Sequence, residues 1–198
     1  MADSLTTQLL ADLAATSAAE GVAVFAGLVY VVLTVQRNRW CWLAGGISSL
    51  ILAVLAAQSL LPMQAVLQAW YVAMSAYGWL RWSDQTGTTV VVWSWRRHLL
   101  GVAVCLVASA VVAAWVASNT NAAWPLLDTA TTAFSLFATL QVARMVRENW
   151  LYWIVIDAVS LVIFAAQGLV LTSLLFAVYL LVAGVGYATW WRQCRKLR

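Results

Sequence analysis

The chain has 198 residues, of which 64% are hydrophobic and only 9% charged, and its formal net charge is +4. A soluble domain carries about 25% charged residues, so this composition excludes a soluble protein and indicates a single helical bundle in a membrane. Three cysteines without paired spacing and a single histidine, His98, indicate no disulfide framework, no metal site and no cofactor.

Seven apolar stretches follow one another along the chain, each long enough to cross a bilayer as a helix. They lie near residues 18–36, 40–60, 63–82, 99–118, 125–144, 150–168 and 171–191. We expect a single transmembrane domain over 18–191, preceded by a short extracellular segment at 1–17 and followed by a basic cytoplasmic tail at 192–198.

The basic residues predict the orientation of the bundle. With seven spans, all eleven lysines and arginines fall in loops or ends on one side of the membrane. That side is cytoplasmic by the positive-inside rule, so the N-terminus is expected outside and the C-terminus inside a bacterial inner membrane. Most tryptophans fall near the same boundary, as in an aromatic belt. Membrane topology therefore explains the positive charge better than nucleic-acid binding does.

The first three and the last three spans resemble each other. In the third and seventh spans the same spacing relates Ala69, Tyr71, Gly78 and Trp82 to Ala177, Tyr179, Gly186 and Trp190. The second and sixth spans open on Arg39-Trp40-Cys41-Trp42 and Asn149-Trp150-Leu151-Tyr152. We therefore expect repeat one at 18–82, a linker helix at 99–118 and repeat two at 125–191. Such a 3+1+3 pseudo-symmetric arrangement of parallel repeats is SWEET-like and predicts a transporter with a midplane substrate site.

A carboxylate interrupts the sixth span. Asp157 lies about eight residues into it, about 12 Å deep, close to the middle of the hydrocarbon layer. A charge at that depth costs several kcal/mol, which favours a functional residue facing protein or water. The alternative is a structural carboxylate that hydrogen-bonds to a neighbouring helix.

Other polar and aromatic side chains form stripes along single helical faces, and these stripes reach the same depth as Asp157. They predict an amphipathic cavity suited to a flat cationic ring, held by aromatic faces and a countercharge. Hydrogen bonds between helices are the plainer interpretation of the serines. The candidate substrate-binding residues are Asp157, Trp153, Ser160, Gln68, Tyr71, Ser75, Trp79, Trp82, Ser135 and Tyr179.

Two segments, Tyr77-Gly78-Trp79-Leu80-Arg81-Trp82 and Glu148-Asn149-Trp150-Leu151-Tyr152-Trp153, resemble the PnuC family of bacterial nicotinamide riboside transporters. The resemblance implies a seven-helix 3+1+3 bundle, assembly as a homotrimer, and facilitated diffusion of a vitamin or vitamin precursor that phosphorylation then traps. Members are assigned to nicotinamide riboside, thiamine or riboflavin. This chain has Asp157, Gly46 and Ser75 where nicotinamide riboside members carry asparagines.

The sequence is consistent with three functions. The first is a passive vitamin transporter, consistent with the absence of a phosphate-binding loop. The second is a proton-coupled symporter that uses Asp157 as its relay. The third is a non-transporter, such as a retinal photoreceptor or a membrane enzyme. The only lysine, Lys196, lies outside the spans, and Asp157 has no obvious catalytic partner.

Overall fold

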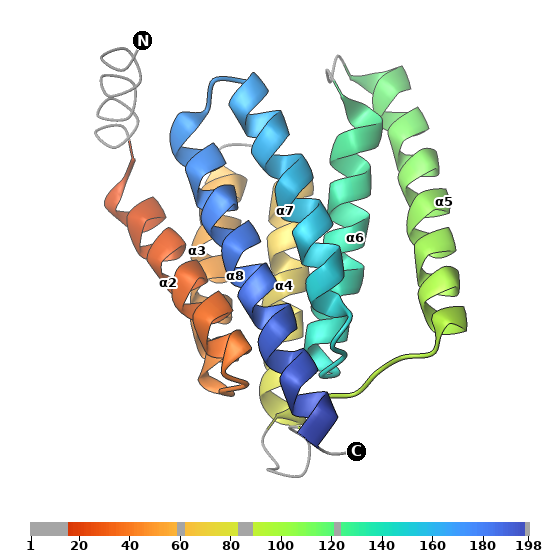
Figure 1. The fold of residues 1–198 in the computed structure, drawn as a ribbon. Coiled ribbons are helices and arrows are strands. Elements are labelled where there is room, and N and C mark those ends of the chain that lie inside the picture. Colours follow the sequence, from red (N-terminus) through yellow and green to blue (C-terminus); the bar gives the residue numbers. More distant parts are fainter. Residues whose placement is uncertain (1–15, 59–61, 83–88, 121–123, 197–198) are drawn as a thin grey trace.

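The computed structural model describes residues 16–58, 62–82, 89–120 and 124–196, and within these ranges the chain is helical apart from its short connections (Figure 1). The predicted all-helical fold is confirmed. The seven helices of the described part are α2 (Ala18–Val35), α3 (Trp40–Gln58), α4 (Pro62–Arg81), α5 (Trp95–Asn119), α6 (Pro125–Ala143), α7 (Asn149–Ala166) and α8 (Val170–Lys196).

Six of these seven helices are long and apolar enough to cross a membrane, and α4 is the exception. Its apolar sequence is diluted by Gln64 and Gln68, which both lie at the central cavity described below. A helix that turns amides toward a polar interior is less apolar overall than one that is covered by lipid.

The ends of several helices depart from the expected spans. Helix α5 begins at Trp95, before the apolar stretch starts, and α8 continues to Lys196. Residues 192–196 of the expected basic tail are therefore the last turns of a helix. The expected N-terminal segment lies outside the described residues except for Thr16 and Ser17, and so do the last two residues of the tail.

Local sequence signals account for the helix starts. Ser17 and Glu20 form a capping box at α2, with the Ser17 amide donating to the Glu20 carboxylate at 2.7 Å. Pro62 and Pro125 each open a helix, where the missing backbone N–H removes no hydrogen bond.

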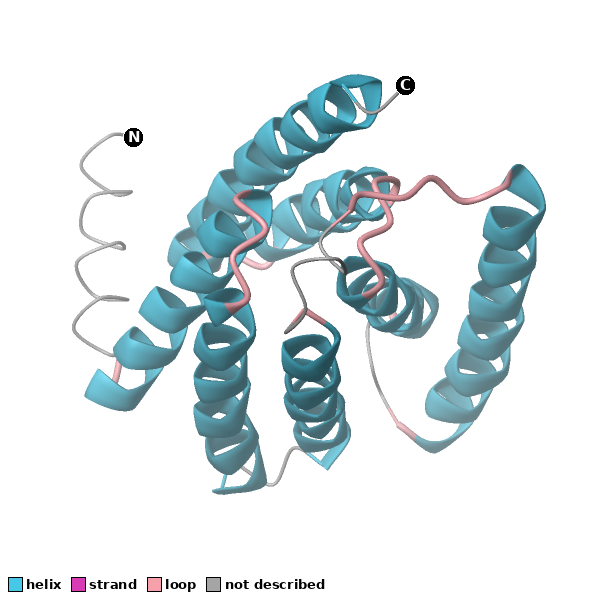
Figure 2. Cartoon of the chain, turned by 90° about the horizontal axis from the view of Figure 1, so that it is seen from below, coloured by secondary structure: helices cyan, strands magenta, loops and turns pink. Residues whose placement is uncertain are grey.

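Six helices form a ring, and the seventh stands outside it (Figure 2). The ring runs in the order α2, α3, α4, α6, α7, α8 and closes where α8 contacts α2. Helix α5 packs mainly against α6 and is set apart from the others (Figures 1 and 2). The two sets of three consecutive helices therefore meet at two seams, α4 with α6 and α8 with α2.

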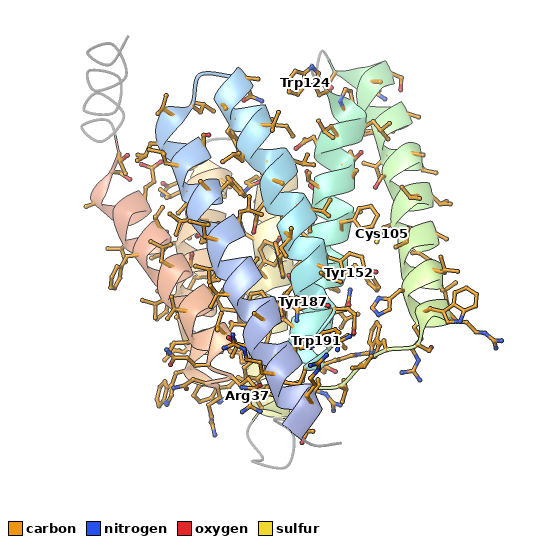
Figure 3. All side chains as sticks on the ribbon, viewed as in Figure 1. Arg37, Cys105, Trp124, Tyr152, Tyr187 and Trp191 are labelled. Carbon is orange, nitrogen blue, oxygen red and sulfur yellow. The ribbon has the colours of Figure 1, made fainter. Side chains whose placement is uncertain are left out.

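The main cluster of buried hydrophobic residues lies at one end of the bundle. Four buried tryptophans form its centre, and each is no more than 2% exposed. These are Trp42, Trp82, Trp150 and Trp190. We call this group the tryptophan floor. Arg37 and Trp191 lie at the same end, whereas Trp124 lies at the opposite end (Figure 3).

The floor consists of one set of contacts that occurs twice. Trp42 of α3 packs on Gly78 of α4 and edge-on against Trp82, with ring centroids 5.3 Å apart. In the other half, the same contacts link Trp150 to Gly186 and to Trp190, with ring centroids 5.5 Å apart.

Hydrogen bonds from the floor cross both seams. Trp82 Nε1 donates to the carbonyl of Ala143 at the end of α6, at 3.1 Å. Trp190 Nε1 donates to the carbonyl of Val35 at the end of α2, also at 3.1 Å. Each half therefore holds the other by an equivalent bond.

These contacts correct the alignment of the second and sixth spans. Trp42, and not Trp40, is the counterpart of Trp150, so the letter match proposed from the sequence is two residues out of register. Trp40 is 55% exposed and packs instead on Trp79, with ring centroids 5.2 Å apart. Arg37 and Met145, with φ of 57° and 56°, mark the equivalent turns after α2 and α6.

Replacing Trp190 with phenylalanine is expected to lower the stability of the protein by about 2 kcal/mol. The substitution removes the hydrogen bond to Val35 and part of a fully buried ring. The melting temperature in detergent should fall, whereas Trp115→Phe, on the exposed face of α5, should leave it unchanged. Equal shifts in both variants would contradict a stabilising role for the seam bond.

Candidate functional site

A cavity of about 450 Å³ lies inside the ring of six helices. Each of the six contributes side chains to its wall, and α5 contributes none. The cavity is therefore built jointly by the two sets of three helices. Its polar lining comprises Thr34, Ser48, Ser49, Gln64, Gln68, Ser75, Asp128, Thr131, Thr132, Ser135, Thr139, Asp157 and Ser160, together with the tyrosines Tyr30, Tyr71 and Tyr179.

The two ends of the cavity differ. At one end the lining includes Trp42 and Trp150, which belong to the buried tryptophan floor. At the other end it includes Gln64 and Asp128, which are both exposed and stand in the first turns of α4 and α6. The cavity thus reaches the surface at the end opposite the arginines and is closed at the arginine end.

Asp157 faces this cavity from the middle of α7 and is only 4% exposed. Both ion pairs formed among the described residues involve Glu148, so no cationic side chain of that part of the chain pairs with Asp157. Tyr71 of α4 and Tyr179 of α8 lie within electrostatic range of its carboxylate. A buried negative charge that faces an open volume provides a binding position for a cation.

The neighbouring predicted residues line the same cavity. Trp153 and Ser160 accompany Asp157 on α7, and Gln68, which is 6% exposed, lies across from them on α4. Ser135 contributes from α6. The hydroxyl of Ser75 also lines the wall, but it donates to the carbonyl of Tyr71 at 2.9 Å. Its capacity to donate to a ligand is therefore already used within α4.

Three rings that are not among the predicted site residues, Tyr30, Phe164 and Phe176, complete the wall beside the predicted Tyr179. Phe164 and Phe176 stack with ring centroids 5.2 Å apart, and Tyr179 meets Phe176 edge-on at 6.0 Å. Tyr30 packs over Gly45, where a Cβ would lie 2.8 Å from its ring. No polar pattern distinguishes these rings from ordinary lipid-facing residues in the sequence, although Phe164 shares the helical face of Asp157.

Two predicted residues, Trp79 and Trp82, lie outside the cavity lining. The ring of Trp82 is buried against Trp42, and its Nε1 bonds to Ala143. The guanidinium carbon of Arg39 lies over the ring of Trp79, 4.0 Å from the ring centroid. Gly46 also lies outside the lining and packs against α4, where a Cβ on it would meet the Ser75 side chain at 3.3 Å.

Comparisons with known proteins agree on one group. The family described as Nicotinamide mononucleotide transporter matches residues 17–192. The Nicotinamide riboside transporter PnuC of Escherichia coli (strain K12) is 26% identical, over 89% of this chain and 86% of its own length. The Riboflavin/roseoflavin transporter RibM of Streptomyces davaonensis is 25% identical, over 86% and 83%.

A solved structure has the same fold. The crystal structure of the vitamin B3 transporter PnuC superposes with a TM-score of 0.75 at 23% sequence identity. The match covers 97% of this chain and 88% of that one. The ring of helices described above is thus the fold of a transporter whose sequence has diverged widely from this one.

Proposed function

The chain belongs to the family of nicotinamide mononucleotide transporters, the PnuC family, and from that premise we propose that it carries a cationic vitamin or vitamin precursor through the central cavity. The observation that carries this proposal is the buried carboxylate of Asp157, which has no ion-pair partner among the described residues and faces a cavity between the two sets of three helices. Membership of this family makes the chain a membrane transporter rather than an enzyme.

The architecture we propose is a 3+1+3 bundle of parallel repeats. Repeat one, residues 18–82, contains α2, α3 and α4, and repeat two, residues 125–191, contains α6, α7 and most of α8, with α5 as linker. The twofold occurrence of the floor contacts and of the seam bonds supports this division. In such folds the substrate site lies at the repeat interface near the midplane, where Asp157 stands.

The orientation we propose puts the arginine end in the cytoplasm, the N-terminus outside, and α4 across the membrane with the other helices. Under this orientation the cavity opens to the outside, and the tryptophan floor closes the inner side. Transport then requires the two seam bonds to Val35 and Ala143 to break when the inner side opens.

The substrate we propose is nicotinamide riboside or thiamine, because both carry a positively charged ring. The proposed contacts are Asp157 as countercharge and the aromatic faces of Trp153, Tyr71 and Tyr179, by cation–π attraction. Gln68, Ser135 and Ser160 supply hydrogen-bonding groups around them, and Ser75 holds the Tyr71 turn. Riboflavin, the substrate named for RibM, has no fixed positive charge and makes less use of Asp157.

We propose that the protein is a homotrimer and that its mode of transport is uniport. Phosphorylation of the substrate by a cytoplasmic kinase then traps it inside the cell. A proton-coupled symporter is the second candidate, since a carboxylate with no ion-pair partner among the described residues could bind a proton in place of a cation. The two candidates differ in whether a proton gradient drives accumulation.

Counterflow in proteoliposomes tests these proposals. Vesicles loaded with unlabelled nicotinamide riboside or thiamine should accumulate the labelled compound without any ion gradient, and empty vesicles should not. Riboflavin should exchange more weakly. If uptake of all three compounds is absent until a proton gradient is imposed, the uniport proposal is wrong and the symport proposal replaces it.

A further inference from the structure

A second hollow, of about 380 Å³, lies at the arginine end of the bundle and shares no lining residue with the central cavity. Three arginines from three different segments surround it. Its lining residues are Tyr77, Arg81, Val91, Trp93, Arg97 and Arg144. Arg81 stands at the end of α4, Arg97 in the first turn of α5 and Arg144 at the C-cap of α6.

The segment before α5 is fixed in place beside this hollow. The Val91 amide donates to the Met145 carbonyl, and the Arg147 amide donates to the Val91 carbonyl, both at 2.9 Å. The Trp93 amide donates to a carboxylate oxygen of Glu148 at 3.3 Å. These bonds hold Trp93 and Arg97 beside the C-terminal end of α6. The hollow is therefore a fixed feature of the fold.

The charge of the three arginines is not balanced within the described part of the chain. Glu148 is the carboxylate held nearby, and it pairs with Arg147 at 2.6 Å and with His98 at 3.8 Å. No other ion pair joins described residues. Three guanidinium groups around one hollow repel each other, and an anion between them would relieve that repulsion.

Helix electrostatics explain two of these arginines but not the third. Arg81 and Arg144 stand at helix C-terminal ends, where a positive charge is favourable. Arg97 stands in the first turn of α5, where a positive charge is unfavourable and a bound anion would be favourable. The N-cap residue of α5, Ser94, makes no side-chain capping bond.

We propose that this hollow binds a phosphate group. One guanidinium group can donate to two phosphate oxygens at once. A basic recess at the cytoplasmic boundary of a helical bundle is the kind of site in which phosphate groups bind. The partly buried rings of Trp93 and Tyr77 line the same hollow and would flank the rest of the ligand. The phosphate could belong to the headgroup of an anionic phospholipid or to a soluble phosphate compound, and the same three arginines would hold either.

Thermal unfolding of the purified protein in detergent tests the proposal. Short-chain phosphatidylglycerol, inorganic phosphate and AMP are added separately, each against sodium chloride at equal ionic strength. We expect at least one of them to raise the melting temperature. A rise with phosphatidylglycerol alone identifies the lipid headgroup, and a rise with phosphate or AMP identifies a soluble ligand.

Single substitutions then locate the site. Arg97→Gln and Arg144→Gln should each weaken the apparent affinity at least tenfold, whereas Arg96→Gln, the same charge change one residue away and outside the hollow, should not. The proposal is overturned if no probe exceeds the salt control, or if Arg96→Gln weakens binding as much as Arg97→Gln. Vitamin counterflow should be unchanged in Arg97→Gln, so this test is independent of the transport proposal.

Discussion

Replacing Asp157 with asparagine is expected to stabilise the substrate-free protein and to weaken substrate binding. The carboxylate is 4% exposed and has no ion-pair partner among the described residues, so its removal should relieve about 1–3 kcal/mol of desolvation cost. The same removal deletes the proposed countercharge for a cationic ring, which should weaken binding about 10- to 100-fold. Melting temperature and counterflow at varied substrate concentration measure the two effects.

Asp128→Asn is the matched control, because it makes the same change at the exposed rim of the cavity. Asp128 lies in the first turn of α6, where a negative charge favours the helix, so its loss should lower stability by about 0.3–1 kcal/mol. The two variants should therefore shift the melting temperature in opposite directions. If Asp157→Asn binds the vitamin as tightly as the unaltered protein, Asp157 is not the countercharge.

The same variant separates the two transport modes. A uniporter with asparagine at this position should still exchange substrate at high concentration, although with reduced affinity. A symporter should lose its dependence on the proton gradient, because asparagine cannot carry the proton. Retained gradient dependence in Asp157→Asn would exclude Asp157 as the relay.

The helices could be predicted from the sequence because a chain in lipid must satisfy every backbone hydrogen bond, so long apolar runs become helices. The ends of α5 and α8 could not be predicted from the same signal. Trp95, Arg96 and Arg97 continue the helical hydrogen bonding of α5 beyond its apolar part. The hydropathy of a sequence indicates where a helix leaves the lipid. It does not indicate where the helix ends, because the helical hydrogen bonds can continue into water.

The register of the proposed repeat could be assigned only from three-dimensional contacts. Tryptophan occurs at both Trp40 and Trp42, so letters alone could align either with Trp150. Only Trp42 packs on the glycine of the neighbouring helix as Trp150 does. The match of the third and seventh spans through Gly78 and Gly186 gave the correct spacing, because those glycines are the positions on which the rings pack.

The site was predictable where a residue is costly in lipid. Asp157 stands out in an apolar run for that reason, and it faces the cavity. Helical periodicity placed Trp82 on the same face as Tyr71 and Ser75, but the face extends farther than the cavity does, and the ring of Trp42 occupies the space beside Trp82. Periodicity gives the direction of a side chain and not the depth at which a cavity ends.

Gly186→Ala is expected to destabilise the protein by about 1–3 kcal/mol or more, because a Cβ at this position would lie 2.6 Å from the ring of Trp150. Gly78→Ala should act in the same way, since a Cβ there would overlap the ring of Trp42. The matched control is Gly184→Ala on the same helix, where a Cβ meets nothing within 4 Å. That substitution should be neutral or stabilising by up to about 1 kcal/mol, because alanine favours helix more than glycine does.

A second substitution tests whether the overlap with Trp150 is the cause. Trp150→Leu creates space beside residue 186, so it should cost stability alone but recover part of the loss when combined with Gly186→Ala. Melting temperatures of the two single variants and the double variant measure this coupling. Additive losses would show that Gly186 serves another purpose.

Because Trp150 also lines the closed end of the cavity, a displaced ring should weaken that closure. Vesicles containing Gly186→Ala should then lose preloaded vitamin faster than those containing Gly184→Ala.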